Sequence, residues 1–308
     1  MTSTRTGSAR VLALLAVFGL LAAACGGGSS DTSSKTKTKA STSTSTTAAE
    51  SGTTDATAAV LAASWGDNVT ITVEGGSYRL VSNGIPNHDR QAEYALPNAG
   101  VRVPAAETAT AGADPTVEQR YDFSIPTEPT NAASPTSTSL GTIGLMISGA
   151  ALFNPYEGDG TTVATASNFT VKNAAGEDVA FLDSCNGHPT PMGEYHYHAL
   201  PKCITTVVDG DAGPSHIIGI AFDGYLIYGN RDIDGKDVTA SQLDDCNGIT
   251  SPTPEFPAGI YHYVLLDTAD STSSIRCFTG EVDASLSNMA AVPMPGGPMP
   301  GGPMPTGV

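Results

Sequence analysis

A six-residue string occurs twice in this chain, and each copy is followed by the same Tyr-His-Tyr tripeptide. The string reads Leu-Asp-Ser-Cys-Asn-Gly in the first copy and Leu-Asp-Asp-Cys-Asn-Gly in the second, and a Pro/Gly turn separates it from the tripeptide each time. We therefore expect a duplicated module, because two copies of one sequence pattern favour the same local structure. The modules cover about residues 141–204 and 216–278, and the matched stretches are 144–153 with 219–228, 182–187 with 243–248, and 195–197 with 261–263.

The pattern of apolar residues predicts strands rather than helices. Residues 69–73 alternate with the period of two that a half-buried strand requires, whereas the only fair helix candidate is the run 53–63. Tight hairpin turns are expected at 148–149 and 223–224. We predict an all-β (mainly β) fold, one sandwich- or barrel-like domain over residues 59–288 with few or no long helices. The other predicted strands are 78–82, 121–125, 143–148, 179–182, 194–199, 217–222, 226–228 and 261–266.

The N-terminal segment has the features of a targeting signal. Residues 1–24 combine Arg5 and Arg10 with an apolar run that ends at Cys25, as in the signal peptide of a bacterial lipoprotein. An ordinary secretory signal is the alternative. In the lipoprotein interpretation Cys25 carries the lipid, and the protein is anchored in the cell membrane on its extracytoplasmic side. Residues 25–58, rich in Ser and Thr, predict a disordered tether.

The C-terminal segment, residues 289–308, repeats Pro-Met-Pro-Gly-Gly and has no packing periodicity, so we predict a disordered tail. Met294, Met299 and Met304 are five residues apart, and regularly spaced thioethers can hold Cu(I). A low-complexity tail in which methionine is incidental is the interpretation we favour.

Acidic residues outnumber basic ones by 31 to 14, which gives a formal net charge of −17. Such a chain repels nucleic acid at close range, so we expect no nucleic-acid partner. The same charge is compatible with cationic ligands or divalent metals, although an acidic surface also simply keeps a protein soluble.

Four cysteines remain once Cys25 is assigned to a lipid, and an oxidising compartment favours disulfides between them. The duplication favours Cys185–Cys203 and Cys246–Cys277, because one bridge then closes the loop of each module. A zinc site made of thiolates is the alternative, but the wide separations and the lack of a C-x-x-C pair argue against it.

Three histidines fall within eleven residues of the first module. Residues two apart in a strand project from the same face, so His196 and His198 should point together. His188, in the turn just upstream, is in a position to supply a third nitrogen. Clustered imidazoles are typical of copper and zinc sites. The alternative is a packed aromatic face in which each histidine is hydrogen-bonded to a carboxylate.

The second module retains one of these three histidines. His262 occupies the position of His196, whereas Ile249 and Val264 stand at the positions of His188 and His198. We expect His262 to be either structural or a single donor to a metal site that the two modules share.

Four further polar residues are candidate hydrogen-bond partners of the ligands, or alternative ligands: His216, Asp223, Glu194 and Asp183. The three acids would also be the nearest bases for a metal-bound water, if the protein were a hydrolase. Motifs for a serine or cysteine nucleophile are missing from the sequence, so it assigns no enzymatic activity.

A separate acidic loop has the spacing of a calcium site. Asp232, Asp234 and Asp237 place oxygen donors at intervals around Gly235, as calcium loops do. The loop lacks the downstream glutamate of an EF-hand, and a solvated turn is the alternative.

The motif Cys-Asn-Gly-His at 185–188, followed by Tyr-His-Tyr-His at 195–198, resembles the signature of YHYH-domain proteins, a secreted bacterial group. Residues 82–86, 153–156 and 219–229 are also similar to stretches of that family. The resemblance extends over roughly residues 69 to 277 and implies no particular activity. The departures at Ile249 and Val264 argue against a second site of the same kind.

Taken together, these patterns favour a cell-surface lipoprotein that binds copper or zinc through His188, His196 and His198. One alternative is a non-catalytic adhesion module, in which histidines and tyrosines line a groove for a cell-wall or glycan ligand. A metal-dependent hydrolase is the other alternative.

Overall fold

The computed structural model describes residues 55–164 and 168–287. The described residues do not include the predicted signal peptide, the predicted lipidation site Cys25, most of the predicted tether or the methionine-containing tail. Helix α1 (Ala56–Ala62) lies within the helix candidate 53–63, and its first three residues belong to the segment assigned to the tether. The side chain of Asp55 caps this helix by accepting a hydrogen bond from the backbone N–H of Thr57.

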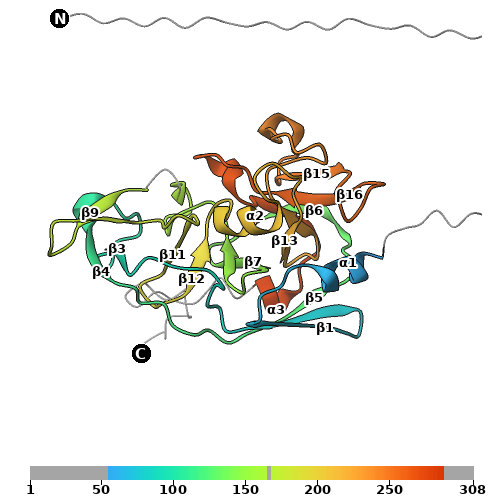
Figure 1. The fold of residues 1–308 in the computed structure, drawn as a ribbon. Coiled ribbons are helices and arrows are strands. Elements are labelled where there is room, and N and C mark those ends of the chain that lie inside the picture. The colour runs from blue at the N-terminus through green and yellow to red at the C-terminus, as the bar shows by residue number, and fades with distance from the viewer. Residues whose placement is uncertain (1–54, 165–167, 288–308) are drawn as a thin grey trace, which may run out of the picture. The chain divides into compact units, whose positions relative to one another are not determined.

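The two modules together build one eight-stranded sheet, to which each contributes four strands (Figure 1). The order of the strands across this sheet is β11-β12-β8-β7-β13-β14-β16-β15, so the second half repeats the first half in reverse. The first module supplies β7 (Thr142–Met146), β8 (Ala151–Phe153), β11 (Gly187–Pro189) and β12 (Tyr195–Tyr197). The second supplies β13 (Ile217–Ala221), β14 (Leu226–Tyr228), β15 (Gly248–Ser251) and β16 (Ile260–Val264).

An approximate twofold axis passes between the antiparallel strands β7 and β13. Leu145 pairs there with Ile220, its own equivalent in the second module. Both copies carry a glycine beside this pair because the two strands approach closely. A Cβ atom on Gly144 would lie 2.6 Å from the carbonyl oxygen of Ile220, and one on Gly219 would lie 2.8 Å from that of Leu145. Any side chain at either glycine would push the two modules apart.

The repeated six-residue string forms the same turn in both modules. Asn186 and Asn247 adopt positive φ angles of 62° and 74°, a conformation that asparagine tolerates better than most residues. An aspartate closes each turn by accepting two backbone N–H groups. Asp183 binds those of residues 185 and 187, and Asp244 binds those of residues 246 and 248.

The described part of the chain also forms four smaller sheets. A three-stranded sheet has the order β1-β2-β5, and three strand pairs are β3 with β4, β6 with β17, and β9 with β10. Their bounds are β1 (Val69–Glu74), β2 (Ser77–Ser82), β3 (Glu93–Pro97), β4 (Ala109–Ala113), β5 (Tyr121–Pro126), β6 (Asn131–Ser137), β9 (Thr170–Lys172), β10 (Asp178–Ala180) and β17 (Cys277–Gly280). The short helices are α2 (Lys202–Val208), α3 (Ala284–Ser287), η1 (Ala106–Thr108), η3 (Ala240–Gln242) and η4 (Ser271–Ser273).

The three-stranded sheet shares one hydrophobic core with the central sheet. Phe123 of β5 packs edge-on against Phe222, which follows β13, with 4.9 Å between the ring centroids. The prediction of a mainly β fold is confirmed. The central sheet is open rather than closed into a barrel, because β11 and β15 are its free edges. Within the described ranges, no helix combines the length and the apolar character that crossing a bilayer requires.

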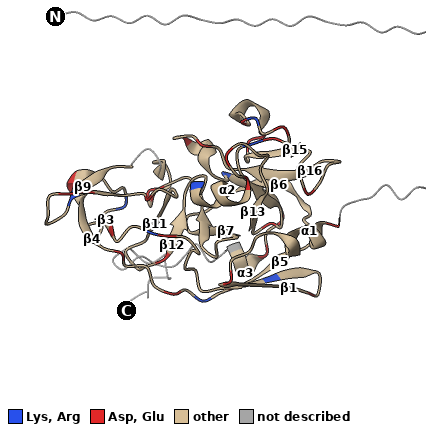
Figure 2. Cartoon of the chain, in the orientation of Figure 1, with Lys and Arg blue, Asp and Glu red and all other residues tan. Residues whose placement is uncertain are grey.

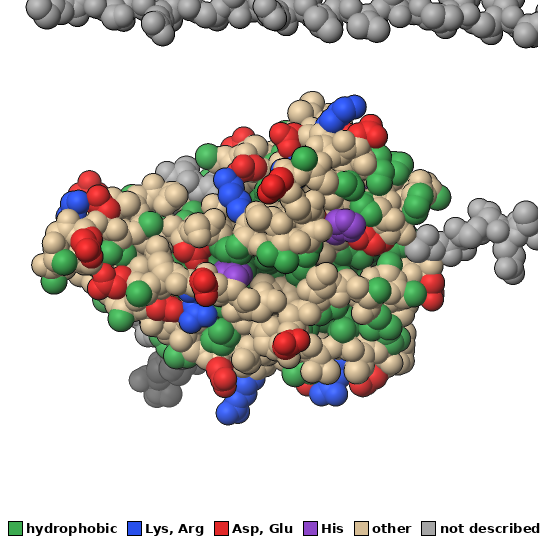
Figure 3. All heavy atoms as spheres, in the orientation of Figure 1, with side chains coloured by type: hydrophobic (Ala, Val, Ile, Leu, Met, Phe, Trp, Pro, Cys, Tyr) green, Lys and Arg blue, Asp and Glu red, His purple; other side chains and the backbone are tan. Residues whose placement is uncertain are grey.

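Both predicted disulfides, Cys185–Cys203 and Cys246–Cys277, are present, one in each module. Their loops span 18 and 31 residues, for which loop-closure entropy predicts roughly 3 to 4 kcal/mol of stabilisation each. Acidic residues are spread over many loops and strand ends (Figure 2). On the face shown in Figure 3, the basic side chains are separated from one another rather than gathered into a patch.

Candidate metal centre

Three histidines of the first module converge on one point inside the domain. His188 on β11 lies directly opposite His196 on β12, and His198 follows two residues later on the same face. One ring nitrogen of each lies within 4.8 Å of the other two. The Nε2 atoms of His196 and His198 are only 2.9 Å apart. The strand geometry thus brings together the three residues expected from the sequence.

The opposite nitrogens of two of these rings are hydrogen-bonded to backbone carbonyls. Nδ1 of His196 lies 3.1 Å from the carbonyl oxygen of Glu194, and Nδ1 of His198 lies 2.7 Å from that of Asn154. A carbonyl oxygen can only accept a hydrogen bond, so each Nδ1 must carry the proton. In the neutral rings both Nε2 atoms are therefore lone-pair donors that face each other, and Nε2 of His188 is a third buried nitrogen without a hydrogen-bond partner.

A proton shared between the two Nε2 atoms would relieve the repulsion between their lone pairs, but the surroundings disfavour protonation. Burial, followed by the electrostatic effect of the other histidines, holds the pKa of His188 and of His196 well below the usual 6.5. Burial also lowers the pKa of His198, to about 4. At neutral pH the cluster is therefore three uncharged imidazoles, and the Nε2 lone pairs of His196 and His198 face each other, which is the form in which imidazole binds a metal ion.

Aromatic rings line the cluster, and its three histidines are buried. Phe153 stacks on His196 with 3.9 Å between the ring centroids, and Phe181 lies 4.3 Å from His188. The three histidines are exposed by only 7, 2 and 3 %, in chain order. Such an apolar shell strengthens any interaction between the imidazoles and a cation.

Two of the acids expected near the ligands bind elsewhere. The carboxylate of Asp183 accepts hydrogen bonds from the hydroxyls of Tyr94 and Tyr195, besides closing its turn. The carboxylate of Glu194 accepts hydrogen bonds from Tyr121 and Thr142. Glu194 does contact the cluster, but through its backbone carbonyl. Both carboxylates thus have other partners, and neither belongs to the group formed by the three histidines.

His216 and Asp223 also lie apart from the cluster. His216 has 40 % of its side chain exposed, and its Nδ1 atom lies 2.8 Å from a carboxylate oxygen of Glu255. Asp223 is fully buried in the second module, where it accepts hydrogen bonds from the hydroxyl of Tyr263 and the N–H of Gly280. Neither residue can support the three histidines from these positions.

The structure corrects the expectation of a metal site shared by the two modules. His262 lies on β16, and four strands separate β16 from β12 in the central sheet. Its Nδ1 atom contacts the carbonyl oxygen of Ile260, and its ring packs against Tyr228. His262 thus keeps the local hydrogen bond of its equivalent, His196, without being part of the cluster.

The acidic loop at 232–237 is a turn that is held together by its own hydrogen bonds. One carboxylate oxygen of Asp232 accepts the backbone N–H groups of Asp234 and Lys236, while the carboxylate of Asp234 pairs with the Lys236 ammonium. Asp237 is hydrogen-bonded to Asn230. The predicted calcium ligands therefore do not converge, and they form no metal-binding group among the described residues.

Sequence reasoning did not identify two features of the site. The carbonyl of Asn154, which orients His198, belongs to a residue 44 positions earlier in the chain. The Phe-Asn-Pro-Tyr stretch at 153–156, noted only for its family resemblance, was the signal available. A second group also emerges, in which His88 lies beside the Cys185–Cys203 disulfide.

The sequence was compared with known protein families, curated proteins and solved structures. The model of a family described as YHYH protein matches residues 122–242 and 232–280, which include both modules and all three clustered histidines. The chain belongs to the YHYH protein family. No curated protein and no solved structure matches it.

Proposed function

We propose that this protein is a lipid-anchored, extracytoplasmic metal-binding protein whose first module holds one copper or zinc ion through His188, His196 and His198. The observation that carries the proposal is the 2.9 Å approach of two Nε2 atoms whose Nδ1 protons are both bound to carbonyls. The anchor is supported by the sequence pattern that ends at Cys25.

The positions of the three ligands are set before any ion binds. Two of the imidazoles are oriented by Nδ1 hydrogen bonds to carbonyl oxygens, as ligating histidines commonly are. The disulfide between Cys185 and Cys203 closes a segment that contains all three. A site built on paired strands and closed by a covalent bridge loses little entropy when it binds an ion.

The ligand set bears on which ion is held. Imidazole suits both copper and zinc, but three neutral rings contribute no negative charge, and the cluster contains no carboxylate. Because the cost of burying an ion rises with the square of its charge, the monovalent Cu(I) ion should be accommodated at lower cost than Zn²⁺.

The two alternative functions have less support. A hydrolase requires a base beside the metal-bound water, and the carboxylates of Asp183, Glu194 and Asp223 are all engaged elsewhere. An adhesion module would expose its histidines and tyrosines in a groove, whereas Tyr195 and Tyr197 are fully buried.

Metal loading of the purified full chain tests the proposal. The protein is loaded with Cu(I) under ascorbate, or with Zn²⁺, then dialysed and analysed for metal by mass spectrometry. We expect about one ion per chain in the wild type and close to none in His196→Ala or His198→Ala.

His216→Ala is the matched control, because this histidine lies outside the cluster and should leave the metal content unchanged. His188→Ile adds a variant that carries the residue of the second module and preserves an apolar interior. Equal metal content in the wild type and in all cluster variants would overturn the proposal.

A further inference from the structure

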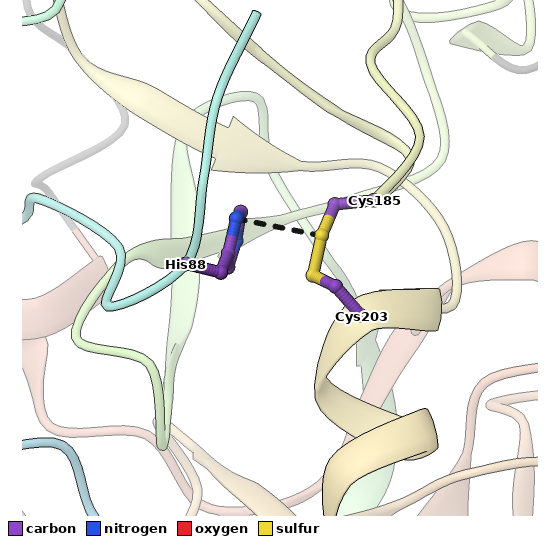
Figure 4. A group of neighbouring side chains, drawn as sticks. All are labelled: His88, Cys185 and Cys203. Atoms are coloured by element: carbon purple, nitrogen blue, oxygen red, sulfur yellow. Dashed lines mark hydrogen bonds between the residues drawn. A yellow bond between two sulfur atoms is a disulfide. The ribbon is translucent and has the colours of Figure 1, made fainter.

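A fourth histidine of the described chain, His88, lies beside a disulfide and not in the cluster of three histidines (Figure 4). The Nδ1 atom of His88 is 3.5 Å from Sγ of Cys185, which is bonded to Cys203. His88 comes from a loop almost a hundred residues earlier in the chain, so tertiary structure alone brings the ring to this sulfur.

Hydrogen bonds define which nitrogen of His88 carries the proton. Nδ1 also lies 2.9 Å from the carbonyl oxygen of Asp89, which can only accept, so Nδ1 is an N–H donor. Nε2 then accepts from the hydroxyl of Tyr197 at 2.5 Å, and this hydroxyl is in turn within 3.0 Å of Ser148 Oγ. The single N–H of Nδ1 is therefore shared between the carbonyl oxygen of Asp89 and the more distant Sγ of Cys185, and the ring is held from its opposite side by Tyr197.

The two cysteines differ in exposure. Cys185 is 1 % exposed, whereas Cys203, at the start of α2, is only partly buried. We therefore expect a thiol in solution to reach Cys203 first. In thiol–disulfide exchange the sulfur that is not attacked leaves as a thiolate, and the reaction is faster when that thiolate is stabilised.

We propose that Cys185–Cys203 is a thiol–disulfide exchange site for an external thiol, with Cys203 as the sulfur attacked and Cys185 as the leaving sulfur stabilised by His88. The attacking thiolate forms a new S–S bond with Cys203 as the Cys185–Cys203 bond breaks. The electron pair of that bond stays on Cys185 Sγ, beside the Nδ1–H of His88. A second thiol then releases Cys203, so that two external thiols are oxidised to one disulfide and Cys185 and Cys203 are reduced.

If the proposed function is correct, this thiol–disulfide exchange would lower the metal affinity of the three clustered histidines. The segment between Cys185 and Cys203 contains His188, His196 and His198. Opening the bridge removes the covalent closure of that segment, and we expect the affinity for metal to fall. This second step rests on the proposed metal site, whereas the exchange itself does not.

The disulfide of the second module is a natural control. Cys246 is 2 % exposed and Cys277 is partly buried, which matches the exposure of the first pair. Within the described ranges, no histidine forms a group with these sulfurs. Arg276 precedes Cys277, but its hydrogen bonds go to the side chain of Asn247 and the backbone carbonyl of Asp244.

The exchange is tested by exposing the folded full chain to reduced glutathione, blocking free thiols with an alkylating agent at timed intervals, and locating the modified cysteines by peptide mass spectrometry. We expect Cys185–Cys203 to open about tenfold faster than Cys246–Cys277, the size of effect that a hydrogen bond to a charged group produces. The first external adduct should appear on Cys203.

Two substitutions separate the role of the N–H group from mere packing. His88→Phe keeps a ring but has no donor, and should bring the two rates to within about twofold of each other. His88→Asn keeps an N–H near the position of Nδ1 and should retain much of the faster rate. Equal rates for the two disulfides in the wild type, or an unchanged ratio in His88→Phe, would overturn the proposal.

Metal retention during the same reaction distinguishes the two proposals. Metal release that keeps pace with opening of Cys185–Cys203 supports both. Faster opening of this disulfide in a protein that never binds metal leaves the exchange site standing and removes the proposed function.

Discussion

In the first module the hydroxyl of Tyr197 lies 3.0 Å from Ser148 Oγ, and in the second the hydroxyl of Tyr263 lies 2.5 Å from a carboxylate oxygen of Asp223. The two tyrosines occupy one position of the duplicated sheet, since each pairs in parallel with the equivalent residue of the neighbouring strand. The polar partner beneath them has changed from a hydroxyl to a buried carboxylate. The comparison shows that the strand pairing is retained while the polar groups around it are exchanged.

The same comparison explains why only one module gathers histidines. His196 and His262 both place Nδ1 against the carbonyl oxygen two residues earlier, at 3.1 and 3.0 Å. The residue directly opposite is His188 in the first module and Ile249 in the second. A cluster therefore needs two further imidazoles on a scaffold that both modules share, and the second module lacks both.

Substituting the histidines of one module by the residues of the other should have the largest effect, which is on the metal content. His188→Ile combined with His198→Val converts the first module to the composition of the second, and the metal content should fall from about one ion per chain to near zero. The converse pair, Ile249→His with Val264→His, should add a second site beside His262. Metal analysis of the loaded proteins measures both outcomes.

The disulfides provide the control for these substitutions. Peptide mapping should show that both pairs remain intact in every variant. A converted first module that still binds a full equivalent of metal would show that the ion sits elsewhere. Failure of the converse pair to bind a second ion would show that the apolar shell around the first cluster is also required.

Acid sensitivity gives the next largest effect. Burial lowers the pKa of His198 from 6.5 to about 4, so between these values the unfolded chain binds a proton that the folded chain does not. Stability of the metal-free protein is therefore complete above pH 6.5 and declines as the pH falls towards 4. His198 alone should account for about 3 kcal/mol of this loss.

Urea unfolding at a series of pH values from 7 to 4 measures this dependence. The variant with His188→Ile and His198→Val should lose less stability over the same window, since His196 and His262 are then the only buried histidines left in the two modules. Identical pH profiles for the variant and the wild type would contradict the assignment of the cluster as neutral and buried.

The aspartates that close the repeated turns give the smallest effect. Asp183 is 8 % exposed and accepts hydrogen bonds from the buried hydroxyls of Tyr94 and Tyr195, whereas Asp244 is exposed and accepts one from Tyr261. Asp183→Ala should therefore cost about 1 to 2 kcal/mol more than Asp244→Ala, because it leaves two buried hydroxyls without an acceptor. Chemical denaturation of the two variants measures the difference, and equal losses would contradict it.

The sequence was informative wherever a property depends on local spacing. Alternation along a strand predicted that His196 and His198 share a face, and the duplication predicted which cysteines pair. It left two roles open for His262, a structural one and that of a donor to a shared site, because a repeat shows that two copies exist but not which of their strands meet. The axis lies between β7 and β13, so the two Tyr-His-Tyr strands are far apart in the sheet.

By itself, then, the sequence specified the repeated turns and the strand period, since each of these depends on neighbouring residues in the chain. Tertiary structure decided which carbonyl orients His198 and which ring lies on the sulfur of Cys185. Those contacts join residues 44 and 97 positions apart, and no local pattern encodes them, because they form only when separate strands and loops pack against one core.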